Sequence, residues 1–270
     1  MHIGWLSTGR DPAARNLLAD VVARSQHDGI DLDIAAVFCD REGGESSESD
    51  RFLDLAERLG FRAVTLSSAA SWQAAQTAGR TREAWRHDFH ESVVRRLAPL
   101  GLDVLVLAGY MLIVSPAMCR RYPMLNLHPA LPGGPTGTWQ DAIWALLRNG
   151  ATETGAMIHL VTPQLDRGPV VAVDHFPIVG HDYDPLWEAF RDKVSRRSFD
   201  AVVQTEGESE PLFAAVRRRG EAREIPLLYR TVKQFVIGKL HTSGGAVLSG
   251  TRKLPLDLTA EVDTELERQA

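Results

Sequence analysis

Strand-like and helix-like segments alternate through the first two hundred residues, and this alternation restricts the fold more than any other feature. A short apolar run at residues 2–7 leads into a turn, where Asp11 followed by Pro12 is typical of a helix start with Asp11 as the N-cap. A second apolar run follows at residues 32–39. Such a strand–helix–strand unit favours parallel strands joined by a right-handed crossover. The sequence therefore predicts an α/β fold with a Rossmann-like, mostly parallel open sheet and helices on both faces.

The same alternation continues to about residue 205. We expect, in order, helix 51–59, strand 61–66, helix 82–97, strand 102–108, strand 124–128, helix 139–148, a β-hairpin of strands 155–161 and 170–176, and one long helix from 185 to 205. The segment 40–50 is polar and is interpreted as a surface loop, and 67–81 as a loop or a frayed helix.

From residue 206 onward the pattern is weaker, so we predict a main domain at 1–205 and an accessory C-terminal extension at 206–270. The extension is expected to hold helices at 212–219 and 227–240, a strand at 247–251 and a terminal helix at 260–269. Arg217–Arg219, followed by Glu221 and Glu224, is interpreted as a solvated helix face. No chemistry is predicted in the extension.

The overall charge and the two cysteines argue against several classes of protein. A net charge of −5 over 270 residues gives no general attraction for nucleic acid. Cys39 and Cys119 have neither the spacing of a metal site nor the number needed for a secreted disulfide framework. No signal-peptide segment follows Met1, and no apolar run is long enough to span a membrane. We expect a cytoplasmic monomer or homodimer that binds small molecules, without nucleic acid, membrane or metal.

The strand at 124–128 carries the first candidate site residues. Alternation places Asn126 and His128 on the same face, two residues apart, and Pro129 ends the strand before a Pro- and Gly-rich loop. An amide donor and a titratable imidazole are thus expected side by side at the end of this strand. The alternative is a half-buried strand whose polar face is merely solvated.

Two further candidate segments follow strands of the same predicted sheet. Apolar residues 109–114 follow the strongly apolar strand 102–108, at the carboxyl end where open α/β sheets bind ligands. Asp166 lies in the tip of the hairpin loop at 162–169, and His159 lies on the strand that leads into it. Ser115, before Pro116, is expected to cap a short helix.

The ordered set of these motifs resembles the folate-dependent formyltransferases over roughly residues 1–200. The matching pieces are Leu107–Met111, Ser115–Pro116, Leu125–Pro132 with its Asn-x-His-Pro, Glu153–Gly155, His159–Val161 and Leu165–Pro169 with its Asp-x-Gly-Pro. Within the family, the pieces are most similar to the enzymes that formylate glycinamide ribonucleotide in purine biosynthesis. The resemblance implies a transferase that moves a formyl group from 10-formyltetrahydrofolate, a co-substrate, to a primary amine.

The resemblance also implies roles for individual residues. Asn126 and His128 would donate hydrogen bonds to the oxyanion formed when the amine attacks the formyl carbon, and Asp166 would keep His128 protonated and relay the proton, so these three residues are the catalytic candidates. The pterin ring of the folate would bind against apolar and loop residues, namely Met111, Leu112, Ile113, Val114, Val161, Thr162 and Leu165.

The acceptor side departs from the family pattern. The phosphate-binding turn after the first strand keeps Gly9 but gains Arg10 and Pro12, and it lacks the glycines of a dinucleotide site. The predicted acceptor-binding residues are Gly9, Arg10, Arg82 and His159. An acceptor-contacting glutamate of the family aligns with Val194. Glycinamide ribonucleotide is the expected acceptor. Three alternatives remain: another small amine such as an amino sugar as the acceptor, a folate-binding relative without catalysis, and hydrolysis with water as the acceptor. Hydrolases of this family usually carry an extra domain before the first strand, and the first strand expected here begins at His2.

Overall fold

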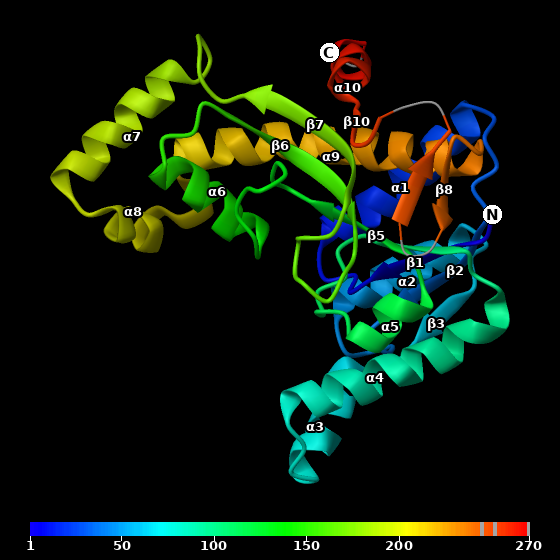
Figure 1. Cartoon of the computed structure of the whole chain (residues 1–270). Helices are drawn as coiled ribbons and strands as arrows, with labels where there is room; N and C mark the ends of the chain where they lie inside the picture. Colours follow the sequence, from blue (N-terminus) through cyan, green and yellow to red (C-terminus); the bar gives the residue numbers. More distant parts are fainter. Residues whose placement is uncertain (244–245, 251–252, 269–270) are drawn as a thin grey trace. The chain divides into compact units, whose positions relative to one another are not determined.

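The structure, a computed structural model, describes residues 1–243, 246–250 and 253–268 (Figure 1). Its main sheet has eight strands in the order β10-β7-β6-β5-β4-β1-β2-β3, and a second sheet pairs β8 with β9. Backbone contacts divide the chain into two units, the first comprising Met1–Asn126, His159–Pro169 and Thr231–Arg252, and the second Leu127–Ile158, Val170–Arg230 and Lys253–Ala270. The predicted α/β fold with a mostly parallel sheet is confirmed.

Parallel strands form the centre of the first unit. They are β1 (Ile3–Ser7), β2 (Ile34–Cys39), β3 (Ala63–Thr65), β4 (Val104–Leu107) and β5 (Met124–His128). β1 pairs with β2 and β4, β2 with β3, and β4 with β5, all in parallel. β1 and β4 are buried along their whole length, because a central parallel strand is covered on both faces.

The helices of the first unit are α1 (Pro12–His27), α2 (Ser47–Arg58), α3 (Ser68–Thr77), α4 (Arg82–Leu97) and α5 (Pro116–Arg121). Four of these five helices begin at a side-chain cap, and α2 is the exception. Asp11 accepts from the Ala14 N–H and Ser115 from the Met118 N–H, which confirms both predicted N-caps. α4 buries Trp85, Phe89, Val93 and Leu97 in the core, as its spacing predicts.

One prediction in the first unit is wrong: the polar segment 40–50 is not all loop, since α2 already begins at Ser47. Of the loop or frayed helix expected at 67–81, the structure contains the helix α3. Ser67 caps α3, which lies beside α4 (Figure 1). Trp72 of α3 packs on Trp85 of α4 with ring centroids 5.3 Å apart. This ring contact and the hydrogen bond of 3.0 Å from Trp85 Nε1 to Ser71 Oγ stabilise a helix whose own sequence has little amphipathic character.

The second unit holds the predicted hairpin segments and most of the later helices. Its elements are α6 (Trp139–Arg148), β6 (Glu153–Leu160), β7 (Val170–Pro177), α7 (Asp184–Arg196), α8 (Phe199–Glu206), α9 (Pro211–Val236), β10 (Leu256–Asp257) and α10 (Thr259–Glu267), of which β6 and α9 continue into the first unit. Gly155 is obligatory on β6, because an added Cβ would lie 2.0 Å from the Asp174 carbonyl oxygen of β7.

Helix boundaries in this unit differ from the prediction. The expected helix 185–205 is two helices, α7 and α8, because Arg197 is extended and Ser198 caps α8 through the Ala201 N–H. The two helices expected at 212–219 and 227–240 are one, α9, which includes Pro226. Leu227, Leu228, Tyr229 and Val232 are all buried, and their packing offsets the hydrogen bond that Pro226 removes.

The predicted extension 206–270 is divided between the two units: residues 206–230 and 253–270 belong to the second and 231–252 to the first. β8 (Leu240–Ser243) and β9 (Ala246–Ser249) form the antiparallel pair. The predicted strand 247–251 and terminal helix 260–269 each extend by one residue outside the described residues. Among the described residues, none of the helices has the length and apolar character needed to cross a membrane.

Candidate active site

Asn126 on β5 contacts a histidine of β6 inside the first unit. Its Nδ2 lies 3.3 Å from Nε2 of His159, and His159 Nδ1 lies 2.9 Å from the Leu160 carbonyl oxygen. Because a carbonyl only accepts, the hydrogen on Nδ1 is assigned to that bond, and Nε2 then accepts from the Asn126 amide. The pair fixes the orientation of the Asn126 amide group, which is the donor predicted to act in catalysis.

Asp166 completes this group from the loop after β6. It is buried, and its Oδ1 lies 3.7 Å from His159 Nε2. Its φ of 52° makes it the one non-glycine residue in the described part of the chain with left-handed backbone. Such a conformation persists only where the surroundings enforce it, and it is common at functional sites. In the same loop residue 168 must be glycine, because an added Cβ would lie 1.7 Å from the Leu160 carbonyl oxygen.

His128 is the last residue of β5 and belongs to the second unit. It is buried, and its Nε2 donates a hydrogen bond of 2.8 Å to the carbonyl oxygen of Pro135. Pro135 lies in the loop between β5 and α6, which ends at a capping box formed by Thr138 and Asp141. The structure therefore holds the imidazole through the loop that the Pro- and Gly-rich sequence predicts.

The residues predicted to bind the pterin ring fall into two groups in the first unit. Met111, Ile113 and Leu165 are 43 %, 45 % and 48 % exposed, which is unusual for large apolar side chains. Leu112 and Val161 instead pack against the core, and Val114 is buried in it. Thr162 turns its hydroxyl back to the Gln164 carbonyl oxygen. The first group therefore offers the most apolar surface to a ligand.

The turn predicted to bind the acceptor already has internal partners. Gly9 has a φ of +59° and donates its N–H to Ser7 Oγ over 3.1 Å. Asp11 accepts from the Ala14 N–H, so a carboxylate of the chain itself lies at the start of α1. Arg10 Nε lies 3.3 Å from Asp11 Oδ2. A helix N-terminus is an anion site in general, but here Asp11 partly satisfies it.

Arg82 stands at the first turn of α4 and is exposed. Its guanidinium lies 5.1 Å from the ring centroid of Trp72 and 5.6 Å from that of Trp85. Cation–π contacts of this kind orient the side chain. The predicted arginine is thus held in place rather than simply solvated.

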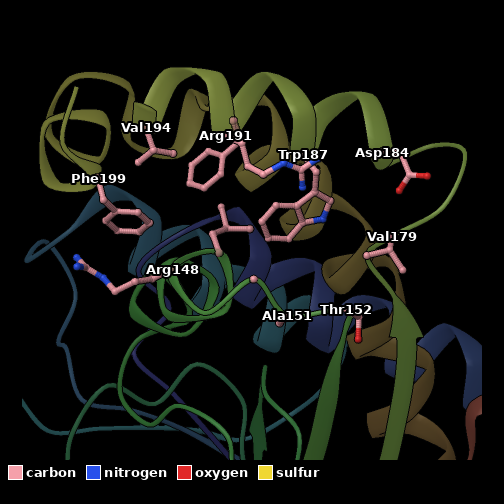
Figure 2. A pocket seen from close by; sticks show the side chains of 12 residues that line it. Arg148, Ala151, Thr152, Val179, Asp184, Trp187, Arg191, Val194 and Phe199 are labelled. Atoms are coloured by element: carbon pink, nitrogen blue, oxygen red, sulfur yellow. The ribbon is translucent and has the colours of Figure 1, made fainter. Parts of the chain in front are cut away.

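Val194, aligned with the family's acceptor-contacting glutamate, lies on α7 and lines a pocket of about 550 Å³ inside the second unit (Figure 2). Trp187 and Arg191 of the same helix, Phe199 of α8 and Arg148 of α6 also line it. None of the predicted catalytic, folate-binding or acceptor-binding residues lies in this wall.

The sequence interpretation missed a charged cluster on α9, because Arg217, Glu221 and Glu224 were expected to be solvated. Arg217 and Glu224 are only 16 % and 17 % exposed, and Arg217 Nη1 lies 2.7 Å from Glu224 Oε1. Arg217 also binds Glu221 over 2.6 Å. Burial raises the pKa of the Glu224 carboxyl above its usual value, while Arg217 and His128 oppose this rise. The spacing of 217, 221 and 224 on one helix face was the available signal.

Among the described residues, no group of three or more His, Cys, Asp or Glu side chains is arranged to hold a metal ion.

Comparison with known proteins identifies relatives of the chain. A family model described as "Formyl transferase" matches residues 13–197. The phosphoribosylglycinamide formyltransferase of Escherichia coli is 37 % identical over 145 residues, which are 51 % of this chain and 59 % of that protein. That of Haemophilus influenzae is 38 % identical over 117 residues, 41 % of this chain and 53 % of the relative. The chain thus matches little more than half the length of these relatives.

Solved structures share the fold over most of the chain. A glycinamide ribonucleotide transformylase 1 from Symbiobacterium toebii gives a TM-score of 0.63 at 23 % identity, covering 92 % of this chain and 93 % of the other. A formyltetrahydrofolate deformylase from Pseudomonas syringae gives a TM-score of 0.59 at 21 % identity, covering 92 % of this chain and 65 % of the other. Most of residues 206–270 therefore fall within a fold that both kinds of protein share.

Proposed function

Because the chain belongs to the formyl transferase family, we propose that it is an enzyme that transfers a formyl group from 10-formyltetrahydrofolate to a primary amine, with glycinamide ribonucleotide as the acceptor. The supporting observation is the arrangement of Asn126, His159 and buried Asp166, with His128 two residues further along β5. The names of the curated relatives support the acceptor and its place in purine biosynthesis. The proposal includes action in the cytoplasm as a monomer or homodimer.

In the proposed reaction the amine nitrogen attacks the formyl carbon and an oxyanion forms. Asn126 and His128 donate hydrogen bonds to that oxygen, and one preorganised donor of this kind lowers the barrier by about 3 kcal/mol. The bond between the formyl carbon and the folate nitrogen then breaks. Asp166 takes part in moving the proton from the attacking amine to that leaving nitrogen, directly or through water. No covalent enzyme intermediate and no metal is needed.

His159 has a positioning role in this proposal. It is almost completely buried, and its two ring nitrogens are directed at Asn126 and at the Leu160 carbonyl oxygen. We assign the pterin ring to the exposed apolar side chains of Met111, Ile113 and Leu165. A ring bound against them would remove their apolar surface from water, which favours binding. Leu112, Val114, Val161 and Thr162 remain part of the proposed folate site; the first three pack in or against the core next to these residues in the chain.

One observation favours a second candidate acceptor. Asp11 caps α1 with a carboxylate, and Pro12 removes one N–H donor from the helix start. Both features weaken this turn as a binding site for a phosphate ester. An amine without phosphate, such as an amino sugar, would not need that site, whereas for glycinamide ribonucleotide Arg10 and Arg82 would have to supply the positive charge.

A spectrophotometric assay that follows release of the deformylated folate, run with a panel of amines, tests the proposal. We expect turnover with glycinamide ribonucleotide at an efficiency ordinary for enzymes, on the order of 10⁴ M⁻¹s⁻¹ or more. Turnover only with an amine that lacks phosphate would select the second candidate. Release of formate without any amine would show hydrolysis, and folate binding without turnover would show a non-catalytic relative.

A further inference from the structure

The pocket of about 550 Å³ inside the second unit has the size of sites that bind small organic molecules (Figure 2). It lies between α6, α7 and α8, and the segments that follow α6 and β7 complete its wall. Binding sites of this kind are mostly apolar and carry a few polar groups that orient the ligand. Both features are present here, and together they indicate the class of ligand that the pocket would accept.

Three aromatic rings form a fixed apolar wall. Trp187 and Phe190 of α7 are buried and nearly perpendicular, with ring centroids 6.0 Å apart, and Phe199 of α8 is nearly perpendicular to Phe190 at 6.1 Å. The indole N–H of Trp187 donates a hydrogen bond of 2.6 Å to the Ile178 carbonyl oxygen, so this ring is already oriented and its one polar group is satisfied. A flat apolar ligand would therefore meet a preformed surface, and little reorganisation would oppose its binding.

An arginine without an internal partner lines the same pocket. Trp187, Arg191 and Val194 follow one another at helical spacing and lie on one side of α7 (Figure 2). Within the described part of the chain, Arg191 is exposed and makes no hydrogen bond and no ion pair. Its guanidinium carries five N–H donors in a planar fork that suits a carboxylate. These donors are therefore available to an anionic group of a ligand in the pocket.

Arg148 of α6 adds a second positive charge. Its guanidinium carbon lies 4.0 Å from the ring centroid of Phe199, which places the charge at the aromatic wall. It also pairs with Asp200 at 2.6 Å, but the two side chains are 57 % and 72 % exposed, and an ion pair so open to water is weak. Asp184 also lines the pocket, but it lies at the end away from Arg148 in Figure 2 and accepts from the Gly180 N–H. The pocket therefore favours an anion at the end that Arg148 forms.

We propose that this pocket binds a small aromatic carboxylate, with its ring on the wall of Trp187, Phe190 and Phe199 and its carboxylate at Arg191 and Arg148. It is a binding site in addition to the residues assigned to formyl transfer, none of which lines the pocket. A neutral aromatic molecule would reach the same rings but would leave the two arginines without an anion, so charge should decide the affinity.

Isothermal titration calorimetry on the full-length protein tests the proposal, with 2-naphthoate as the probe and naphthalene-2-carboxamide as its uncharged analogue. The pocket variants are Arg191→Gln and Arg148→Gln. Arg196→Gln is the matched control, because Arg196 is an exposed arginine of α7 that does not line the pocket. The indole N–H signal of Trp187 in ¹H–¹⁵N NMR spectra locates the bound ligand. Thermal melting checks that each variant is folded.

We expect 2-naphthoate to bind with a Kd between about 10 µM and 1 mM, which is ordinary for a ligand of this size, and to shift the Trp187 indole signal. The carboxamide should bind about tenfold more weakly, and each pocket variant should weaken binding of the carboxylate about tenfold, because a hydrogen bond between charged groups is lost. Arg196→Gln should bind as the parent does. Absence of binding, equal affinity for the two ligands, or unchanged binding in both folded pocket variants would overturn the inference.

A titration with folic acid separates this pocket from the proposed folate site, because the benzoylglutamate part of a folate also joins an aromatic ring to carboxylates. We expect saturating folic acid to leave the affinity for 2-naphthoate and the Trp187 signal unchanged. Displacement of 2-naphthoate by folic acid would assign the pocket to the co-substrate and overturn the inference. Binding is measured without any formyl transfer, so the result does not depend on the proposed function.

Discussion

Arg223 and Asp174 form a two-point ion pair in the core of the second unit: Nε lies 2.7 Å from Oδ2, and Nη2 lies 2.6 Å from Oδ1. The two side chains are 2 % and 0 % exposed. The remaining Nη1 lies 2.7 Å from Asp263 Oδ1, so the arginine connects α9, β7 and α10. Burial raises the pKa of Asp174, and Arg223 opposes that rise.

Removing the arginine should therefore leave a buried carboxylate without compensation. We expect Arg223→Met to lower the free energy of unfolding by about 3–5 kcal/mol, measured by equilibrium denaturation. Arg218→Met, on the exposed side of the same helix, should change it by less than about 0.5 kcal/mol. Replacing both members, as in Arg223→Met with Asp174→Leu, should recover part of the loss. A single variant within 1 kcal/mol of the parent, on the scale of ordinary surface changes, would contradict this account.

His90 should make the stability of the protein depend on pH. It is buried on α4, its Nδ1 faces the Arg86 carbonyl oxygen at 2.9 Å, and the Tyr110 hydroxyl lies 3.2 Å from its Nε2. Burial lowers the pKa of His90 from 6.5 to about 4. Between pH 4 and 6.5 the unfolded chain therefore binds more protons than the folded chain. As the pH drops from about 6.5 to about 4, the free energy of unfolding should fall by about 3 kcal/mol in total.

Denaturation curves across this pH range provide the measurement. His90→Gln should flatten the dependence, whereas His87→Gln, which changes an exposed histidine on the same helix, should keep the slope of the parent. Equal slopes in the two variants would show that the titration of His90 does not control acid stability.

Asp166→Asn should remove the negative charge of this residue while keeping the size of its side chain and its backbone conformation. Asparagine adopts left-handed backbone readily, so the loop should remain intact at the φ of 52°. We expect turnover to fall by about two orders of magnitude or more, because proton transfer of this kind contributes about that much, while folate affinity changes little. Arg167→Gln, at the next and exposed position, serves as the control. Near-normal kcat in Asp166→Asn would exclude the proposed role.

The exposed apolar surface should affect folate binding rather than chemistry. We expect Met111→Ser and Leu165→Ser each to raise the KM for the folate by about tenfold with kcat nearly unchanged, since each removes about 1–2 kcal/mol of apolar burial. Leu248→Ser is the matched control, because Leu248 is 45 % exposed on β9 and has no assigned ligand. A fall in kcat at constant KM would place the pterin ring elsewhere.

Much of the candidate site could be predicted because it depends on local rules. Period-2 alternation placed Asn126 and His128 on one strand, and the Asp11 and Ser115 caps fixed two helix starts. The sequence did not show which side chains of the segment 111–114 are exposed and which are buried, because this depends on how each one packs against the core. The partial burial of Arg217 and Glu224 could not be predicted either, because it depends on tertiary neighbours such as Trp139 of α6, over whose ring the Arg217 guanidinium lies.

The sequence by itself determined the alternation of strands and helices, the strand that carries Asn126 and His128, and the Asp-x-Gly loop, because each follows from backbone preferences acting over a few residues. Tertiary structure decided where those preferences are overruled. α9 runs through Pro226 because its apolar side chains are buried, and α3 is stabilised as a helix where Trp72 packs on Trp85. Arg217 is largely removed from solvent where its guanidinium lies over the ring of Trp139 in α6. Packing energies of several kcal/mol exceed the fractions of a kcal/mol by which local propensity distinguishes one conformation from another.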